Sequence, residues 1–349
     1  MNKQRGIALI AVLLLVALMV IIGTEVMFRQ DRYFARTQSL VDWDQRYQYA
    51  MAAEVLALRV LNDDLEQDRN HTVLTDDCVN DFWAVELPPT PYENAWLTAS
   101  VQDLQGRFNI NSLVQLKGEE FVRHEGAQRR LVYLLENLLN EPAKAQLLAS
   151  ELGDWLDSNN LIDDPQGAED ADYRWRRTPN MPVAHESELR ALKSFTAQEF
   201  SEVEFWGLFA ALPVGSKLNV NTAAPLVLNA YFADTVGLEG TAFVLEQRAE
   251  GAIEDLSVLF ASGPFAALEE EQVNALLELF TVRTDYFQVM VEVRTNEHTQ
   301  RVATRIQRLE NGQVNVYSRQ VVPRLRPMEP ACNPFYSNDL NAEGSGVDG

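Results

Sequence analysis

The residues best suited to chemistry form an acidic segment in the middle of the chain. Seven carboxylates fall between positions 154 and 172: Asp154, Asp157, Asp163, Asp164, Glu169, Asp170 and Asp172. A hard cation such as Ca²⁺ takes six to eight oxygen ligands from loops of this kind. The EF-hand register does not fit, because a loop starting at Asp157 would put Leu161 and Ala168 in ligand positions. The residues alone leave two readings open, a calcium loop and a solvated acidic loop balanced by the arginines among residues 174–177.

Other motifs associated with catalysis are incomplete. His124-Glu125 and His185-Glu186 begin like the zinc-protease motif H-E-x-x-H, but neither has the second histidine. The run Gly344–Gly349 matches G-x-G-x-x-G by letter only, since no strand precedes it and no helix follows it. We therefore expect neither an enzyme nor a small-molecule substrate.

The charge balance argues against nucleic acid as a partner. The chain has 29 Lys and Arg against 51 Asp and Glu, a formal net charge of −22, and such a surface repels polyanions. Asn219–Pro225, ahead of a predicted helix, resembles the opening of helix-hairpin-helix modules, some of which bind DNA. Without a basic cluster, we interpret it as a helix start, with Thr222 or Asn221 as N-cap and Pro225 in the first turn. A membrane-tethered DNA-binding protein, such as a competence factor, is the alternative.

The first 24 residues have the pattern of a membrane-targeting segment. A short basic stub ending at Gly6 precedes an apolar run from Ile7 to Ile22, extended to Thr24. Eighteen residues reach about 27 Å, just enough for the hydrocarbon core of a bilayer, and Lys3 and Arg5 hold the N-terminus in the cytoplasm. The run fits a cleaved signal peptide, a plain membrane anchor, or a prepilin-type leader cut after Gly6.

The next sixty residues favour the prepilin-type leader. Residues 24–87 contain no Gly and no Pro, and apolar side chains recur at intervals of three and four. The pattern predicts one amphipathic helix from Ile7 to about Leu61, ended by Asn62-Asp63-Asp64. A signal peptide or a simple anchor does not require this continuation, whereas a pilin-like subunit does.

Strand patterns flank a helical middle. Alternation predicts strands at 95–101, 286–293, 300–306 and 314–318, and helices at 131–139, 143–156 and several later segments. We therefore predict an α+β fold, in which a pilin-like long N-terminal helix packs on an antiparallel sheet that is interrupted by a large inserted all-α domain.

Five short segments together resemble a known family, the minor pseudopilin K of bacterial type II secretion systems. They are the leader Lys3–Gly6 before Ile7, residues 103–113, the acidic pair of motifs Asp154–Asp157 and Gly167–Asp170, and Asn219–Ala223. The resemblance implies a subunit cut by prepilin peptidase between Gly6 and Ile7 and then methylated. It also implies a place at the tip of the periplasmic pseudopilus with the minor pseudopilins I and J, in a system that exports folded proteins across the outer membrane. A minor pilin of another type IV filament is a second alternative.

One position departs from the wider pilin pattern. Most pilin-like subunits have glutamate as the fifth residue of the mature chain, whereas counting from Ile7 gives Ala11 here. A carboxylate in lipid is costly unless it is paired, and its partner in a filament is the amine of the subunit nearer the tip. A tip subunit has no such partner, so Ala11 fits a subunit at the tip of the filament. The resemblance also implies that this family lacks the usual glutamate.

These expectations divide the chain into successive parts. Residues 1–6 are the leader, 7–24 the transmembrane half of the helix, and 25–112 and 283–325 the two parts of the pseudopilin domain. Residues 113–282 are the inserted α-domain, with the acidic calcium loop at 154–172 and a helix-hairpin-like part at 215–282, and 326–349 form a flexible tail. The chain crosses the inner membrane once, with its bulk in the periplasm.

The resemblance also implies bound calcium, for which we predict the ligands Asp154, Asp157, Glu169, Asp170 and Asp172.

The two cysteines of the chain can form a disulfide. Cys78 follows the long helix and Cys332 follows the last strand, and thiols in the oxidising periplasm tend to pair. We predict a Cys78–Cys332 disulfide, with two unpaired thiols as the alternative.

Overall fold

A computed structural model describes residues 5–71, 74–78, 81–85, 88–196 and 203–322. These residues form two compact units, one up to Ala52 and one from Ala53 onward. The α-helices are α1 (Arg5–His71), α2 (Glu125–Leu139), α3 (Pro142–Leu156), α4 (Val203–Gly207), α5 (Pro225–Phe232), α6 (Gly237–Glu250), α7 (Leu256–Phe260) and α8 (Glu270–Leu279). Short 3₁₀ turns are η1 (Phe82–Ala84), η2 (Ile110–Leu113), η3 (Asp170–Asp172), η4 (Glu186–Ala191) and η5 (Gly263–Ala267).

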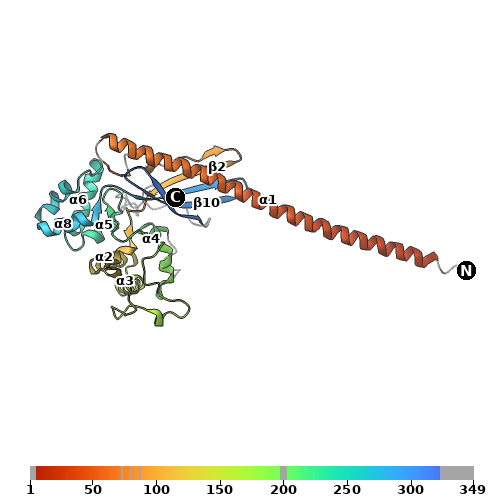
Figure 1. Cartoon of the computed structure of the whole chain (residues 1–349), viewed down its shortest axis with the longest axis horizontal. Coiled ribbons are helices and arrows are strands. Elements are labelled where there is room, and N and C mark those ends of the chain that lie inside the picture. The colour runs from red at the N-terminus through yellow and green to blue at the C-terminus, as the bar shows by residue number, and fades with distance from the viewer. Residues whose placement is uncertain (1–4, 72–73, 79–80, 86–87, 197–202, 323–349) are drawn as a thin grey trace, which may run out of the picture. The chain divides into compact units, whose positions relative to one another are not determined.

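The first unit consists of the N-terminal part of α1, which Figure 1 traces as one uninterrupted helix. Among the described residues, α1 is the helix that is long and apolar enough to cross a membrane, and its most apolar stretch has no buried residue. Apolar side chains on all sides of a helix, without a protein core around them, are typical of a membrane span.

The predicted end of this helix is wrong, because α1 continues past Asn62-Asp63-Asp64 to His71. Leu61 and Leu65 lie on one face and are both buried, at 0% and 2% exposed. The carboxylate of Asp64 is held by a guanidinium from a distant strand, at 3.2 Å. Tertiary packing therefore stabilises residues whose local preference is to end a helix.

The second unit is built around a five-stranded antiparallel sheet in the order β1-β2-β9-β10-β11. Its strands are β1 (Thr90–Tyr92), β2 (Ala95–Asp103), β9 (Tyr286–Arg294), β10 (Thr299–Arg308) and β11 (Val314–Val322). In Figure 1, β2 and β10 lie beside the later part of α1, and hydrogen bonds join Glu54 of that helix to Thr304 at 2.5 Å and to Arg319 at 2.6 Å. The predicted strands and the pilin-like fold class are confirmed.

Neighbouring strands β2 and β9 enclose everything between Asp103 and Tyr286, where α-helices are the main regular secondary structure. This insertion also contains three two-stranded ladders, β3–β6, β4–β5 and β7–β8. Their strands are β3 (Phe108–Asn109), β4 (Val114–Lys117), β5 (Glu120–Arg123), β6 (Phe209–Ala210), β7 (Leu218–Asn219) and β8 (Phe280–Thr281). Its own hydrophobic core includes a group of contacting rings, Phe232, Phe260, Phe265 and Phe280. Because the insertion has its own hydrophobic core, it packs as a domain.

Asn219–Pro225 joins the insertion to the sheet. Pro225 does begin α5, but the predicted cap is wrong, because the N-cap is Ala224 and no side chain caps the helix. The Asn219 amide instead donates to Asp76 O, Asp103 Oδ2 and Thr284 Oγ1, and Thr222 Oγ1 donates to Asp103 Oδ2. These two side chains donate to buried acceptors and do not cap the helix. The junction buries several backbone and carboxylate oxygens, and each of these needs a hydrogen-bond donor.

Candidate metal centre

Helix α3 brings the first two predicted ligands into the interior of the insertion. Pro142 begins this helix, and Asp157 is its C-cap residue. Asp154 lies in its last turn, where Trp155 and Leu156 are buried beside it. Asp154 and Asp157 are themselves 0% exposed. Two carboxylates fully removed from water near one helix end need compensation by donors or by a cation.

The loop after α3 adds a third carboxylate. One oxygen each from Asp154, Asp157 and Asp163 lies within 4.8 Å of the others. Asp163 was among the seven carboxylates of the acidic segment but not among the predicted ligands. Its place shows that the loop turns back over the helix end, which the spacing along the chain did not reveal.

Three buried carboxylate oxygens in this region have no hydrogen-bond partner in the described structure: Asp154 Oδ2, Asp157 Oδ2 and Glu169 Oε1. Glu169, a predicted ligand, is 5% exposed, and its other oxygen accepts from Thr178 Oγ1 at 2.9 Å. A carboxylate oxygen buried without a donor carries a desolvation cost of about 1–3 kcal/mol or more. Three such oxygens, at the end of α3 and in the loop after it, form a set of acceptors suited to a cation.

A glycine makes room for this arrangement. A Cβ added to Gly167 would lie 1.8 Å from Asp154 Oδ2, far inside contact distance. The backbone at Gly167 can therefore lie close to the unpartnered oxygen of Asp154 only because glycine has no side chain. Gly167 belongs to the Gly167–Asp170 motif singled out in the sequence.

One cation already lies at the edge of the cluster. Arg123 Nη2 donates to Asp154 Oδ1 at 2.5 Å, and Arg123 Nε lies 3.8 Å from Asp163 Oδ2. A single guanidinium leaves the group of Asp154, Asp157, Asp163 and Glu169 with an excess of negative charge.

Burial and mutual repulsion raise the pKa values of these carboxyls. Burial raises the pKa of Asp154 to about 6, although Arg123 opposes the shift, and Glu169 and Asp163 add to it. Burial, and then the charge of Asp163, raise the pKa of Asp157 to about 7. Burial also raises the pKa of Glu169. A bound divalent cation would oppose these shifts and lower the pKa values, because it favours the ionised form of each ligand.

The remaining predicted ligands, Asp170 and Asp172, have other partners. Asp170 Oδ1 accepts from the backbone N–H and the hydroxyl of Thr178, at 2.8 and 3.0 Å. Asp172 pairs with Lys193 at 3.0 Å and accepts from the N–H of Glu169, which closes the turn η3. Hydrogen bonding to Lys193 lowers the pKa of Asp172. In the described structure these two side chains order the turn that presents Glu169, and their role as ligands stays a prediction.

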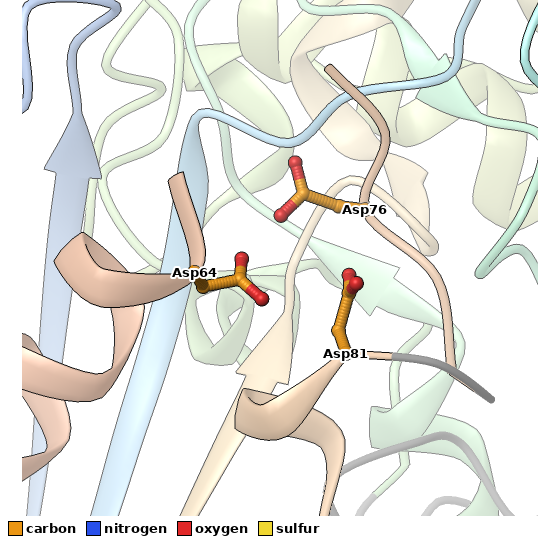
Figure 2. Close-up of side chains that lie close together, drawn as sticks. All are labelled: Asp64, Asp76 and Asp81. Carbon is orange, nitrogen blue, oxygen red and sulfur yellow. The ribbon is translucent and has the colours of Figure 1, made fainter. Parts of the chain in front are cut away.

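A second acidic cluster was not foreseen from the sequence. Figure 2 shows the carboxylates of Asp64, Asp76 and Asp81 turned toward one another, and one oxygen of each lies within 4.8 Å of the others. Arg308 of β10 binds two of these carboxylates, with Nη2 at 2.5 Å from Asp76 Oδ1 and Nη1 at 3.2 Å from Asp64 Oδ2. Asp81 Oδ2 accepts from the Asp77 N–H and from Trp83 Nε1. This cluster is an internal ion-pair network that connects α1, the following loop and the sheet.

The other residues singled out in the sequence have structural roles or lie outside the described residues. His124 and His185 are the N-caps of α2 and η4, where each ring accepts from a backbone N–H. Gly6 and Ile7 lie in the first turns of α1. Cys78 lies in the loop before η1, and Cys332 lies outside the described residues, so their pairing stays a prediction.

Comparisons with known proteins agree on one family. A family model described as type II secretion system (T2SS), protein K, matches residues 106–206, which include the acidic loop at 154–172. Type II secretion system protein K of Aeromonas hydrophila is 30% identical over 300 residues, 82% of this chain and 88% of that protein. Its counterpart in Pseudomonas aeruginosa is 30% identical over 328 residues, 91% of this chain and 93% of that protein.

Among solved structures, the fold resembles a chain in the crystal structure of the GspK–GspI–GspJ complex from the enterotoxigenic Escherichia coli type 2 secretion system. The TM-score is 0.70 at 24% identity, with 82% of this chain and 99% of that chain covered. The fold therefore agrees with what the sequence relatives indicate. With 30% identity across nearly the full length of two relatives, the chain belongs to the type II secretion system protein K family.

Proposed function

We propose that this chain is a minor pseudopilin at the tip of the type II secretion pseudopilus, where it assembles with the minor pseudopilins I and J. The observation that carries the proposal is membership of the protein K family together with a membrane-length α1 that continues into a folded unit. The similar chain in the GspK–GspI–GspJ structure supports the same partners. Ala11, in place of the usual glutamate, suits a subunit with no neighbour above it.

The proposed function includes processing and placement. Prepilin peptidase cuts between Gly6 and Ile7, the new amine is methylated, and residues 7–24 span the inner membrane with the remainder in the periplasm. The basic residues Lys3 and Arg5 and the exposed apolar side chains of α1 support this orientation.

We further propose that the acidic loop binds Ca²⁺ through Asp154, Asp157, Asp163 and Glu169. The unpartnered buried oxygens of three of these residues, and the close approach of Gly167, support the site. Carboxylate oxygens on an irregular loop suit Ca²⁺ better than Mg²⁺, which demands tighter octahedral geometry. The ion would fasten the loop to the end of α3 and so order the segment up to η3, a structural and not a catalytic role.

Export provides the test of the pseudopilin proposal. In a strain that lacks its own copy of this gene, the wild-type chain should restore secretion of a type II substrate, and a Gly6→Leu variant that blocks processing should not. Pull-down from wild-type membranes should recover pseudopilins I and J. Normal secretion without the gene, or binding of the chain to DNA in a gel-shift assay but not to I and J, would favour the alternatives of another filament or a competence factor.

Calcium is tested separately by melting the purified full chain in detergent. Chelator should lower the Tm, and Ca²⁺, but not equal Mg²⁺, should restore it, because a ligand that binds only the folded state stabilises it by mass action. Asp157→Asn should remove the calcium response, while Asp234→Asn, in an exposed ion pair with Arg129, should keep it. The same Tm with and without chelator would rule out a calcium site that stabilises the fold.

A further inference from the structure

An apolar groove runs along the later part of α1 in the second unit. It has a volume of about 650 Å³ and lies between that helix, strands β1 and β2, and the turn η1. Leu56, Phe82, Val85 and Tyr92 line it and are 68%, 63%, 57% and 45% exposed. Large apolar side chains gathered in one hollow are unfavourable in water and mark a surface that something covers.

The chain itself has a segment that can cover this groove. Strand β11 ends at Val322, and 27 residues follow it. The predicted disulfide would attach Cys332 to Cys78, which lies four residues before Phe82 in the loop that forms one wall of the groove. The bridge would thus bring the tail to the edge of the groove.

The tail is long enough for this path. Across the sheet, Val322 lies level with Arg301, Glu292 and Thr98. The loop that bears Cys78 lies near the other end of β2, because Asn219 bonds both Asp76 O and Asp103 Oδ2. Three strand spacings and five residues along a strand give a separation of roughly 22 Å. The nine residues 323–331 can extend to about 30 Å.

The composition of the tail also matches the groove. Pro330, Pro334, Phe335 and Tyr336 surround Cys332. Aromatic side chains gain most from burial in an apolar hollow. Proline has no backbone N–H, so a proline-rich segment leaves fewer unpaired donors against a wall that offers few acceptors. We infer that residues 330–336 of the same chain bind in the groove between α1 and β2 and complete the core on that side.

Photo-cross-linking of the purified full chain in detergent tests this inference. A benzoylphenylalanine placed at Leu56, on the α1 wall, should react with residues 330–336 of the same molecule, as identified by mass spectrometry of the monomer. The same probe at Val258, which is 66% exposed on α7, should not. Cross-links from Leu56 only to detergent, or only to a second polypeptide, would overturn the inference and identify a lipid or another subunit as the occupant.

A truncated chain gives an independent readout. A stop after Leu325 should raise amide hydrogen exchange in β1 and β2 at least tenfold, while exchange in α2 stays unchanged and shows that the insertion is still folded. Cys332→Ser should give a smaller rise, because it removes the attachment and keeps the apolar residues. Unchanged exchange in β1 and β2 after truncation would show that the tail does not cover the groove.

Discussion

Replacement of Arg308 by methionine should strongly destabilise the second unit. Arg308 is 2% exposed, and it donates to Asp76 at 2.5 and 2.7 Å, to Asp64 at 3.2 Å and to the carbonyl of Leu61 at 3.1 Å. Methionine fills much of the same volume but leaves two buried carboxylates without their cation. Removal of one partner of a buried ion pair costs about 3–5 kcal/mol.

The loss of folding stability in Arg308→Met should depend on pH, and the pKa shifts of the two carboxyls determine the direction of that dependence. Burial raises the pKa of Asp64 to about 7 and also raises the pKa of Asp76, even with Arg308 present. Groups whose pKa is higher in the folded state favour folding when protonated, and this stability is lost as the pH rises from their unfolded values through their folded values. Without the guanidinium both pKa values rise further. The difference between Arg308→Met and wild type should therefore be largest near pH 8 and should shrink toward pH 5.

Urea unfolding of the full chain in detergent, followed by tryptophan fluorescence at several pH values, measures this difference. Arg129→Met is the matched control, because Arg129 pairs with Asp234 at 3.0 Å while both side chains are more than half exposed. That substitution should cost no more than about 1 kcal/mol. An Arg308→Met loss equal to the control, or one that does not change with pH, would refute the assignment of Arg308 as the counter-ion of buried carboxylates.

Three further outcomes follow from the same structure. Gly167→Ala should lower the Tm and abolish its response to calcium, since the new Cβ would overlap Asp154 Oδ2; a response equal to wild type in a calcium titration would contradict this. Mass spectrometry of the chain purified from membranes should show a methylated N-terminus at Ile7, and an intact Met1 would disprove leader processing. Thiol labelling of unreduced, denatured protein should find no reactive Cys78, whereas two labelled cysteines per chain would show that the bridge is absent.

The sequence alone predicted the features that depend on local pattern. An apolar run after a basic stub and a long stretch without Gly or Pro indicated α1, because helix formation is decided mainly by residues within a few turns. Alternation of apolar and polar residues predicted β2, β9, β10 and β11, since a strand with one buried face has a period of two. The density of carboxylates between 154 and 172 identified the acidic loop as a candidate cation site without any knowledge of its geometry.

Tertiary structure decided which of these residues act together. Asp163 lies with Asp154 and Asp157, while Asp170 turns to Thr178, because the path of the loop and not its composition sets the distances between carboxylates. Arg308 pairs with acids more than 230 positions earlier in the chain, and that pairing helps α1 continue past its expected end. Periodicity carries no information on such contacts: a buried charge is tolerated only where the fold delivers its partner, and the partner is chosen by the packing of distant elements.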